Sequence, residues 1–474
     1  MTPVTPVTSV TSVIAVVPPA RVSPVTRSWR WLAALPPHVV LLAALALFLE
    51  YAFPGFVGFD QVDHFVQART GVYNDAHPPT VALLFRACEV FVRGPALVLI
   101  GQALLIEWGL FRLLCRRLAP RAAAWAAAAI FLWPPFAGVF AVVGKDGLMF
   151  GFLLFGLSHA IDRDGSRGSR ALGFACLFLG TAVRWNALAA TAPLVVLLIE
   201  TRWSGVRRYL ASVGIWLAIT AAAFLLNQAL TARPAYYWYC TQAYQDIANT
   251  VRWSDLDEPT LERELAATPL AHRDHVLDRI RASYNPAHFV QLNNGPDRIW
   301  NVPQTDAERT AVARAWRSIV LGHVPAYLRY RRDNFALLLS IDRIPQFSNV
   351  YVWFHQLAEQ GAVDTIQHDA TSARIGAWLR TGAIAVSLTP LYWVFLYVGA
   401  CLLLLPFALG DRLATALLLS ALAYEAAWFF IAPTTDFRYS TWLMPCLGAA
   451  LALTIARRVR CRGTPGSCKP GHPP

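Results

Sequence analysis

Residues 34–53 read ALPPHVVLLAALALFLEYAF, an apolar run long enough to cross a bilayer as a helix. It is followed directly by Phe59-Asp60-Gln61-Val62-Asp63-His64 and then by Asp75-Ala76-His77-Pro78-Pro79. Carboxylates and imidazoles are therefore expected to lie together at a membrane surface. An enzyme that acts on a lipid-borne substrate would keep its catalytic base in such a place.

Further apolar runs recur along the 474-residue chain, which is 56% hydrophobic and only 15% charged. Soluble domains carry nearer a quarter charged residues and lack repeated apolar runs of bilayer length. The runs are continuous in Leu, Ala and Val, whereas a transmembrane β-barrel would show alternating strands of about ten residues. The composition therefore predicts an all-α polytopic membrane protein.

The net charge of +12 is concentrated in short loops between the apolar runs. Arginines cluster around residues 112–121, 163–170, 202–208 and 457–462. Loops enriched in Arg face the cytoplasm and its anionic lipids. This distribution favours membrane lipids as partners and argues against nucleic acid.

About ten crossings account for the apolar runs, and they place every basic loop and both termini in the cytoplasm. The crossings are predicted near residues 34–53, 95–114, 121–134, 146–161, 170–184, 186–200, 208–230, 388–409, 411–432 and 439–457. An acidic first external loop (54–94), a short loop (135–145) and a large segment (231–387) then lie outside. Within them, residues 78–93 and 374–387 are expected to lie in the plane of the membrane surface.

The chain divides into five parts. Residues 1–30 and 461–474 have the low-complexity composition of disordered tails, here cytoplasmic ones. Residues 31–230 form an N-terminal transmembrane module that is expected to carry the catalytic groups, and residues 388–460 form the C-terminal transmembrane helices. Residues 231–387 are more polar, and their amphipathic stretches predict a helical cap on the external face.

The acidic loop offers the clearest chemistry. Asp60 and Asp63 are three residues apart, so on a helix they share a face. His64 flanks them, and Asp75 and His77 follow in the same loop. Two carboxylates at a wet interface can deprotonate a hydroxyl or hold a divalent cation. The alternative interpretation is that these are solvated loop charges.

Three further polar clusters are placed on the same face by the predicted crossings. Lys145-Asp146 precedes the fourth crossing, and Lys145 is one of only two lysines in the chain. Considered alone, this pair is better explained as a helix-capping Asp beside a snorkelling Lys. Arg184 stands between two crossings, where a guanidinium could bind a lipid phosphate. Asp436-Phe437-Arg438-Tyr439 precedes the last crossing.

This layout resembles the GT-C superfamily of integral membrane glycosyltransferases, in particular bacterial relatives of the protein O-mannosyltransferases and the aminoarabinose transferases. The resemblance covers most of the chain. It is carried by the acidic first loop, His77-Pro78-Pro79 and its amphipathic helix, and the three motifs Gly144-Lys145-Asp146-Gly147-Leu148, Arg184-Trp185-Asn186 and Asp436-Phe437-Arg438-Tyr439.

The resemblance implies an inverting transfer of a sugar from a polyprenyl-phosphate donor to an acceptor hydroxyl at the outer face of the cell membrane. Asp60 would be the catalytic base, and Asp146 would orient a metal or the acceptor. Lys145, Arg184 and Arg438 would bind the donor phosphate and stabilise its developing charge. Asp63, His64, Asp75 and His77 would form the acceptor or metal region.

The family also admits a divalent cation, Mg²⁺ or Mn²⁺, which Asp60 and Asp146 would hold. Many members carry Asp-Glu in the first loop, whereas here Asp60 is followed by Gln61. One carboxylate of the usual pair is therefore missing, and Asp63, one helical turn further on, is the candidate to replace it.

Two other functions are open. A transporter or lipid flippase would need charges near the bilayer midplane or repeated broken helices; Glu107 and Glu425 are the only mid-span acids, and no internal repeat is visible. A non-catalytic membrane scaffold would bind a partner through its external segment. It would tolerate the loss of Asp60 and Asp146.

Overall fold

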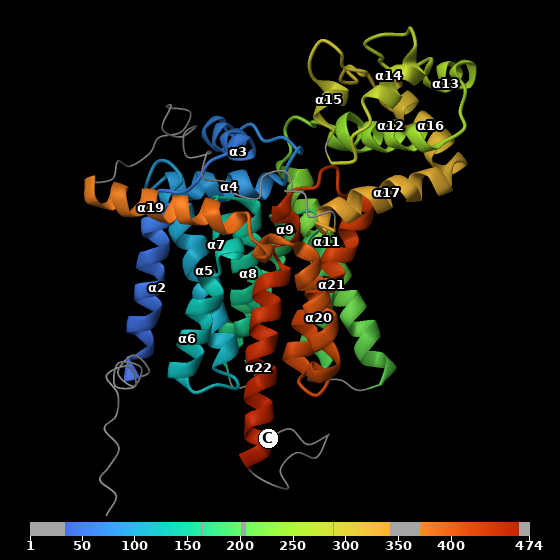
Figure 1. The fold of residues 1–474 in the computed structure, drawn as a ribbon. Helices are drawn as coiled ribbons and strands as arrows, with labels where there is room; N and C mark the ends of the chain where they lie inside the picture. Colours follow the sequence, from blue (N-terminus) through green and yellow to red (C-terminus); the bar gives the residue numbers. More distant parts are fainter. Residues whose placement is uncertain (1–33, 163–164, 201–204, 288, 342–369, 464–474) are drawn as a thin grey trace, which may run out of the picture.

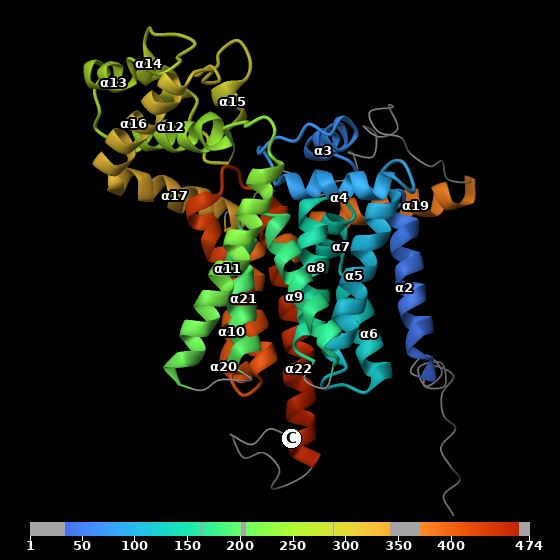
Figure 2. The same cartoon turned by 180° about the vertical axis from the view of Figure 1, so that it is seen from behind.

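The computed structural model describes residues 34–162, 165–200, 205–287, 289–341 and 370–463, and over these residues it is helical with no β-strand (Figure 1). Ten helices run side by side as a bundle (Figures 1 and 2). They are α2 (Pro37–Ala52), α5 (Ala96–Leu114), α6 (Pro120–Phe131), α8 (Lys145–Ala160), α9 (Arg167–Ala182), α10 (Ala187–Glu200), α11 (Val206–Leu230), α20 (Val394–Ala408), α21 (Arg412–Ile431) and α22 (Leu443–Gly463). Both tails predicted to be disordered fall largely outside the described residues.

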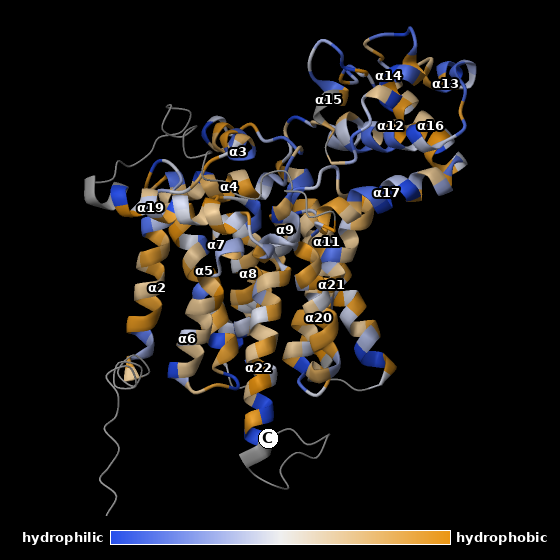
Figure 3. Cartoon of the chain, in the orientation of Figure 1, coloured by the Kyte–Doolittle hydropathy of each residue, from blue (hydrophilic) through white to orange (hydrophobic). Residues whose placement is uncertain are grey.

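The bundle is consistent with a helical membrane protein. Among the described residues, four helical stretches are long and apolar enough to cross a membrane: Ala96–Leu114, Val206–Leu230, Arg412–Ile431 and Phe437–Arg460. A fifth is added if α6 and its continuation count as one broken span. Figure 3 shows that apolar residues dominate the bundle, while polar residues gather at its two ends. A helix lies at each of the ten predicted positions, but the number of crossings stays a prediction.

The second predicted external loop contains a helix. Residues 135–145 were predicted as a short external loop, and α7 (Pro134–Phe140) fills the first half of them. Pro134 and Pro135 occupy the first turn of α7, where a proline needs no amide donor but cannot continue the preceding helix. The chain therefore bends by 69° between α6 and α7.

At one end of the bundle, three helices lie across the bundle axis: α3 (Phe59–Thr70), α4 (Pro79–Glu89) and α19 (Ala370–Ser387) (Figures 1 and 2). We call this the cap end. The two segments expected to lie in the membrane surface, 78–93 and 374–387, contain α4 and most of α19. Both lie outside the bundle as expected, and their contact with a membrane stays a prediction.

The cap is formed by α12 (Ala243–Trp253), α13 (Glu258–Leu265), α14 (Val276–Ala282), α15 (Val290–Asn293), α16 (Asp306–Gly322) and α17 (Val324–Leu338). It has a hydrophobic core of its own, with Tyr244 stacked on Trp300 at 4.7 Å between ring centroids. The predicted segment 231–387 is divided in space, because α19 packs against α2 and α7, away from the cap (Figure 1). Residues 342–369, which join the two, lie outside the described residues.

Candidate functional site

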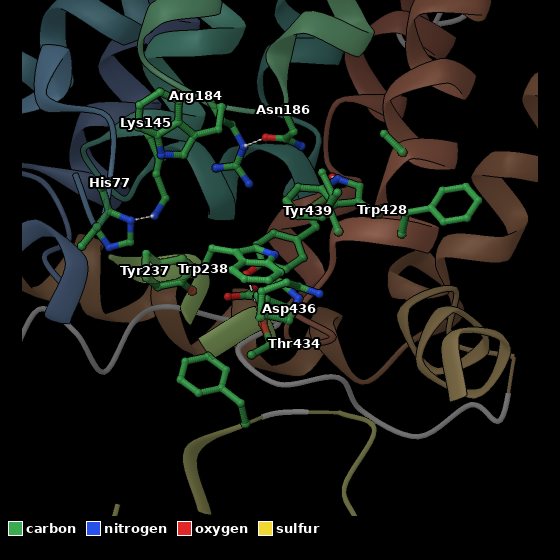
Figure 4. A pocket seen from close by; sticks show the side chains of 18 of the residues that line it. His77, Lys145, Arg184, Asn186, Tyr237, Trp238, Trp428, Thr434, Asp436 and Tyr439 are labelled. Atoms are coloured by element: carbon green, nitrogen blue, oxygen red, sulfur yellow. Dashed lines mark hydrogen bonds between the residues drawn. The ribbon is translucent and has the colours of Figure 1, made fainter. Parts of the chain in front are cut away.

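A cavity of about 720 Å³ lies where the cap meets the cap end of the bundle. One side is polar and contains Asp60, His77, Lys145, Arg184 and Arg438, five of the residues singled out in the sequence. Figure 4 shows side chains from the bundle, from the segment before the cap and from the turn before α22 converging on it. The structure therefore brings together groups that are up to 378 residues apart in the chain.

Asp60 enters the cavity from the first turn of α3. The amide of Gly58 donates to Gln61 Oε1 at 3.0 Å, and this capping contact fixes where the helix begins. Gln61, which follows Asp60 in the chain, therefore has a structural role in the helix cap. Asp60 Oδ2 accepts from Lys145 Nζ at 2.8 Å and from an Arg438 guanidinium nitrogen at 3.0 Å.

Lys145 is positioned by an unusual backbone turn. Gly144 precedes α8 with φ of +147°, a conformation that side chains on Cβ disfavour. A Cβ at this position would also lie 3.0 Å from the side-chain nitrogen of Gln61, Nε2. The turn thereby aims the first residue of α8 at Asp60, while Asp146, the second, points to Arg184.

His77 connects Lys145 to Asp60. Lys145 Nζ lies 3.0 Å from His77 Nδ1, so the ammonium donates and Nδ1 accepts (Figure 4). The remaining nitrogen, Nε2, then carries the proton and faces Asp60 Oδ1 at 3.4 Å. The residues after His77 are fixed by Asn227 of α11, whose Oδ1 accepts from the Thr80 amide at 3.0 Å.

Electrostatics define the charge states in this cluster. Burial alone would raise the pKa of Asp60, but Lys145, His77 and Arg438 together lower it well below its ordinary value. Burial, followed by the nearby Lys145 charge, lowers the pKa of His77, and Asp60 opposes this only in part. At neutral pH the site therefore holds an ionised Asp60 and a neutral His77.

Arg438 belongs to a single 3₁₀ turn, Phe437–Ser440, between α21 and α22. Asp436 caps the turn by accepting from the Arg438 amide at 3.1 Å, and its Oδ2 lies 2.8 Å from Arg438 Nε. Ser440 at the end of the turn donates to Glu425 of α21 at 2.9 Å. Glu425 is thus a contact for this turn near the cap end of its helix.

Arg184 is held more tightly than the other two cations. It forms an ion pair with Asp146, and its Nε donates to Asn186 at 3.1 Å (Figure 4). Its guanidinium also lies 5.4 Å from the Trp428 ring, which stacks on Tyr439 at 4.0 Å. Because it combines an ion pair, a hydrogen bond and contacts with two aromatic rings, Arg184 is less able than Lys145 or Arg438 to rearrange around a ligand.

The other walls of the cavity are apolar. Trp185 just before α10 and Leu188 in its first turn line the cavity together with Phe430 and Ile431 at the end of α21. Phe430 and Ile431 are 58% and 41% exposed, so this wall continues onto the outer apolar surface of the bundle. Trp238 and three aromatic residues of the cap complete the cavity opposite the bundle.

Four predicted site residues lie outside the cavity lining, and one of them is Asp146, which pairs with Arg184 behind it. Asp63 accepts from Gln67 at 2.6 Å one turn along α3, although its spacing from Asp60 suggested a shared role. Asp75 accepts from the Ala235 amide and ties the first loop to the segment after α11. His64 is buried behind His77, with the ring centroids 5.2 Å apart.

The predicted divalent cation does not fit the arrangement of these side chains. Within the described residues no group of three or more His, Cys, Asp or Glu side chains is placed to bind a metal ion. Asp60 is surrounded by Lys145, Arg438 and His77, and Asp146 is paired with Arg184. A metal would have to displace these cations before it could reach either carboxylate.

Several cavity residues were not assigned from the sequence. Asp436 was quoted only as part of a motif, and Trp428 stood inside an apolar run. Tyr237 and Trp238 line the cavity from the aromatic run 236–239, which begins six residues after α11 ends at Leu230. Four consecutive aromatic residues shortly after an apolar helix were the available signal, since such residues gather at membrane interfaces and in ligand pockets.

Comparison of the chain with protein-family models, with curated proteins and with solved structures finds no significant match.

Proposed function

We propose that this protein is a membrane glycosyltransferase of the GT-C type, which moves a sugar from a polyprenyl-phosphate donor to an acceptor hydroxyl. The observation that carries the proposal is the meeting of Asp60 with Lys145 and Arg438 in one cavity at the cap end. A carboxylate that can accept a proton thus lies beside two cations that can bind a phosphate, as sugar transfer from a phosphodiester requires.

The reaction conserves atoms and charge without a further reactant. The acceptor oxygen forms a bond to the anomeric carbon from the face opposite the phosphate, and the bond from that carbon to the phosphate oxygen breaks. The electron pair leaves on the phosphate, and the hydroxyl proton passes to Asp60. Lys145 and Arg438 stabilise the growing negative charge, and the sugar inverts its configuration.

The apolar wall of the cavity suits the lipid part of the donor. Trp185, Leu188, Phe430 and Ile431 lead from the charged groups to the outer surface of the bundle. A polyprenyl chain lying along this wall would leave its phosphate at Lys145 and Arg438. The proposal includes about ten crossings of the cell membrane, with the cap end outside and both termini in the cytoplasm.

The test is transfer in isolated membranes that contain the protein, using a panel of radiolabelled polyprenyl-phosphate sugars. Wild type should release label from at least one carrier, and Asp60→Asn should lower the rate by about 10²-fold or more. Asp162→Asn is the matched control: Asp162 also pairs with two arginines, at 3.4 and 3.2 Å, but at the other end of α8. Unchanged turnover in Asp60→Asn would refute the assignment of the base.

The two other functions predict different outcomes of the same experiment. A lipid flippase would move labelled carrier across vesicles and leave the sugar attached to it. A scaffold would show neither activity and would tolerate Asp60→Asn in cells. No transfer from any donor, together with translocation of the intact carrier, would therefore replace the present proposal with the transporter.

A further inference from the structure

The cations expected to bind the donor phosphate are already engaged by the proposed base. Lys145 and Arg438 both contact the same oxygen of Asp60, Oδ2, at 2.8 and 3.0 Å. The third cation, Arg184, is paired with Asp146 and buried among aromatic rings. An incoming phosphate therefore has two rearrangeable partners, and reaching them means competing with Asp60.

The charges around the polar side of the cavity balance before any ligand arrives. Three cations face three carboxylates. Lys145 pairs with Asp60, Arg184 with Asp146, and Arg438 with both Asp60 and Asp436. A phosphodiester brings one negative charge and no counterion of its own. Its binding leaves this cluster one negative charge in excess, so a proton becomes easier to accept.

We propose that the donor phosphate takes Lys145 and Arg438 from Asp60, and that this exchange turns Asp60 from an ion-pair partner into a base. The inference rests on the proposed function, because it gives the order of events at the same site. Donor binding precedes proton removal, and an acceptor hydroxyl that arrives first meets a carboxylate whose charge is already compensated.

The groups facing Asp60 support this exchange. They are Lys145 from α8, His77 from the loop before α4, Arg438 from the turn before α22, Tyr237 from the segment after α11 and His64 on α3 itself. After burial, which acts in the opposite direction, Lys145 is the largest influence on the pKa of Asp60 and lowers it. A phosphate that shares Lys145 and Arg438 weakens both contacts, so the pKa of Asp60 rises.

Linkage gives the exchange a measurable sign. If anion binding raises the pKa of Asp60, then protonation of Asp60 must strengthen anion binding by the same factor. Between the low pKa of the free protein and the raised pKa of the complex, binding takes up a proton. The affinity for a phosphodiester therefore rises as the pH falls toward this range, and the Asp60→Asn variant, which is neutral at every pH, binds more tightly than wild type.

The test is binding of dodecyl methyl phosphate, a monoanionic phosphodiester with a lipid chain, to the purified full-length protein by calorimetry. We expect Asp60→Asn to bind about 5- to 150-fold more tightly than wild type, the usual range for coupled sites. Asp162→Asn should bind as wild type does, because its carboxylate pairs with Arg112 and Arg116 at the opposite end of the bundle.

Proton uptake on binding is a second measurement, and it uses the wild-type protein only, so it does not depend on the folding of a variant. Binding heats in buffers of different ionisation enthalpy give the number of protons taken up, which should be above zero and rise as the pH is lowered. Weaker or equal binding by Asp60→Asn, or no proton uptake by wild type, would overturn the exchange. Because no sugar is transferred in these measurements, their outcomes are independent of the transfer assay. If phosphodiester binding is coupled to protonation of Asp60 but no sugar is transferred, the exchange stands and the proposed function fails. If sugar is transferred without this coupling, only the exchange is refuted.

Discussion

Asp60 illustrates what single residues in this sequence reveal and what they conceal. Its type and its place after the first apolar run were sufficient to select it as a candidate base. Its pairing with Lys145 and Arg438 was not predictable, because those partners are 85 and 378 residues away and only tertiary packing brings them together. Three residues predicted as separate base and phosphate ligands are therefore one ion-paired group.

Asp63 shows how little spacing alone says about contact with the cavity. A spacing of three predicted a shared helical face, and both residues do lie on α3. Asp60 lies in the first turn, beside the cavity, whereas Asp63 is one turn further along and bonds to Gln67. Spacing on a helix determines which residues share a face, but the point where the helix meets the cavity determines which of them can act.

Gly144 gives a prediction about the backbone. Gly144→Ala forces a side chain into a conformation with φ of +147° and against Gln61, so we expect a loss of about 1–3 kcal/mol in stability. Lys145 would also move away from Asp60, so transfer should fall. Gly214→Ala is the control, because a Cβ there meets nothing within 4 Å. Equal thermal midpoints for the two variants would contradict this account of the turn.

At the level of helices, the apolar runs predicted where helices lie, whereas proline chemistry determined where they end. The amphipathic pattern of residues 316–339 is divided between α16 and α17 at His323, with Pro325 in the first turn of α17. The stretch 262–284 is likewise divided between α13 and α14. The hydrophobic periodicity of these stretches indicated amphipathic helices. It carried no information on the separation of α19 from the cap.

Arg331 of α17 attaches the cap to the bundle. It is fully buried, donates to Asp246 of α12 at 2.5 Å and to the backbone oxygen of Ala432 at 2.9 Å, and so joins two cap helices to the end of α21. Burial raises the pKa of Asp246 to about 6, and Arg331 opposes this rise. Removing either partner of this buried ion pair would therefore destabilise the protein.

We therefore expect Arg331→Ala to destabilise the protein by about 3–5 kcal/mol, because it leaves Asp246 buried without its cation. The change is measured as a shift of the thermal midpoint and as faster proteolysis of the cap. Arg332→Ala is the control, since the neighbouring Arg332 is largely exposed and pairs with an adjacent Asp333. A similar small shift in both variants would show that the cap is held by other contacts.

On the scale of the whole molecule, the distribution of arginines predicts that the cap end faces outward. Asp306→Cys in the cap and Arg167→Cys at the start of α9 report on opposite ends of the bundle, and both positions are exposed. In a background with the eight native cysteines replaced, an impermeant maleimide added to intact cells should label the first and reach the second only after permeabilisation. The reverse pattern would invert the topology and place the cavity in the cytoplasm.

The central claim is that one carboxylate both competes with the donor phosphate and accepts the acceptor proton. The most direct test measures two quantities on a single variant, Asp60→Asn, beside wild type and Asp162→Asn: the rate of sugar transfer and the affinity for a phosphodiester. This account predicts that they move in opposite directions, with transfer lost and phosphodiester affinity raised. A variant in which both are lost together would show that Asp60 holds the donor in place, and it would contradict the account.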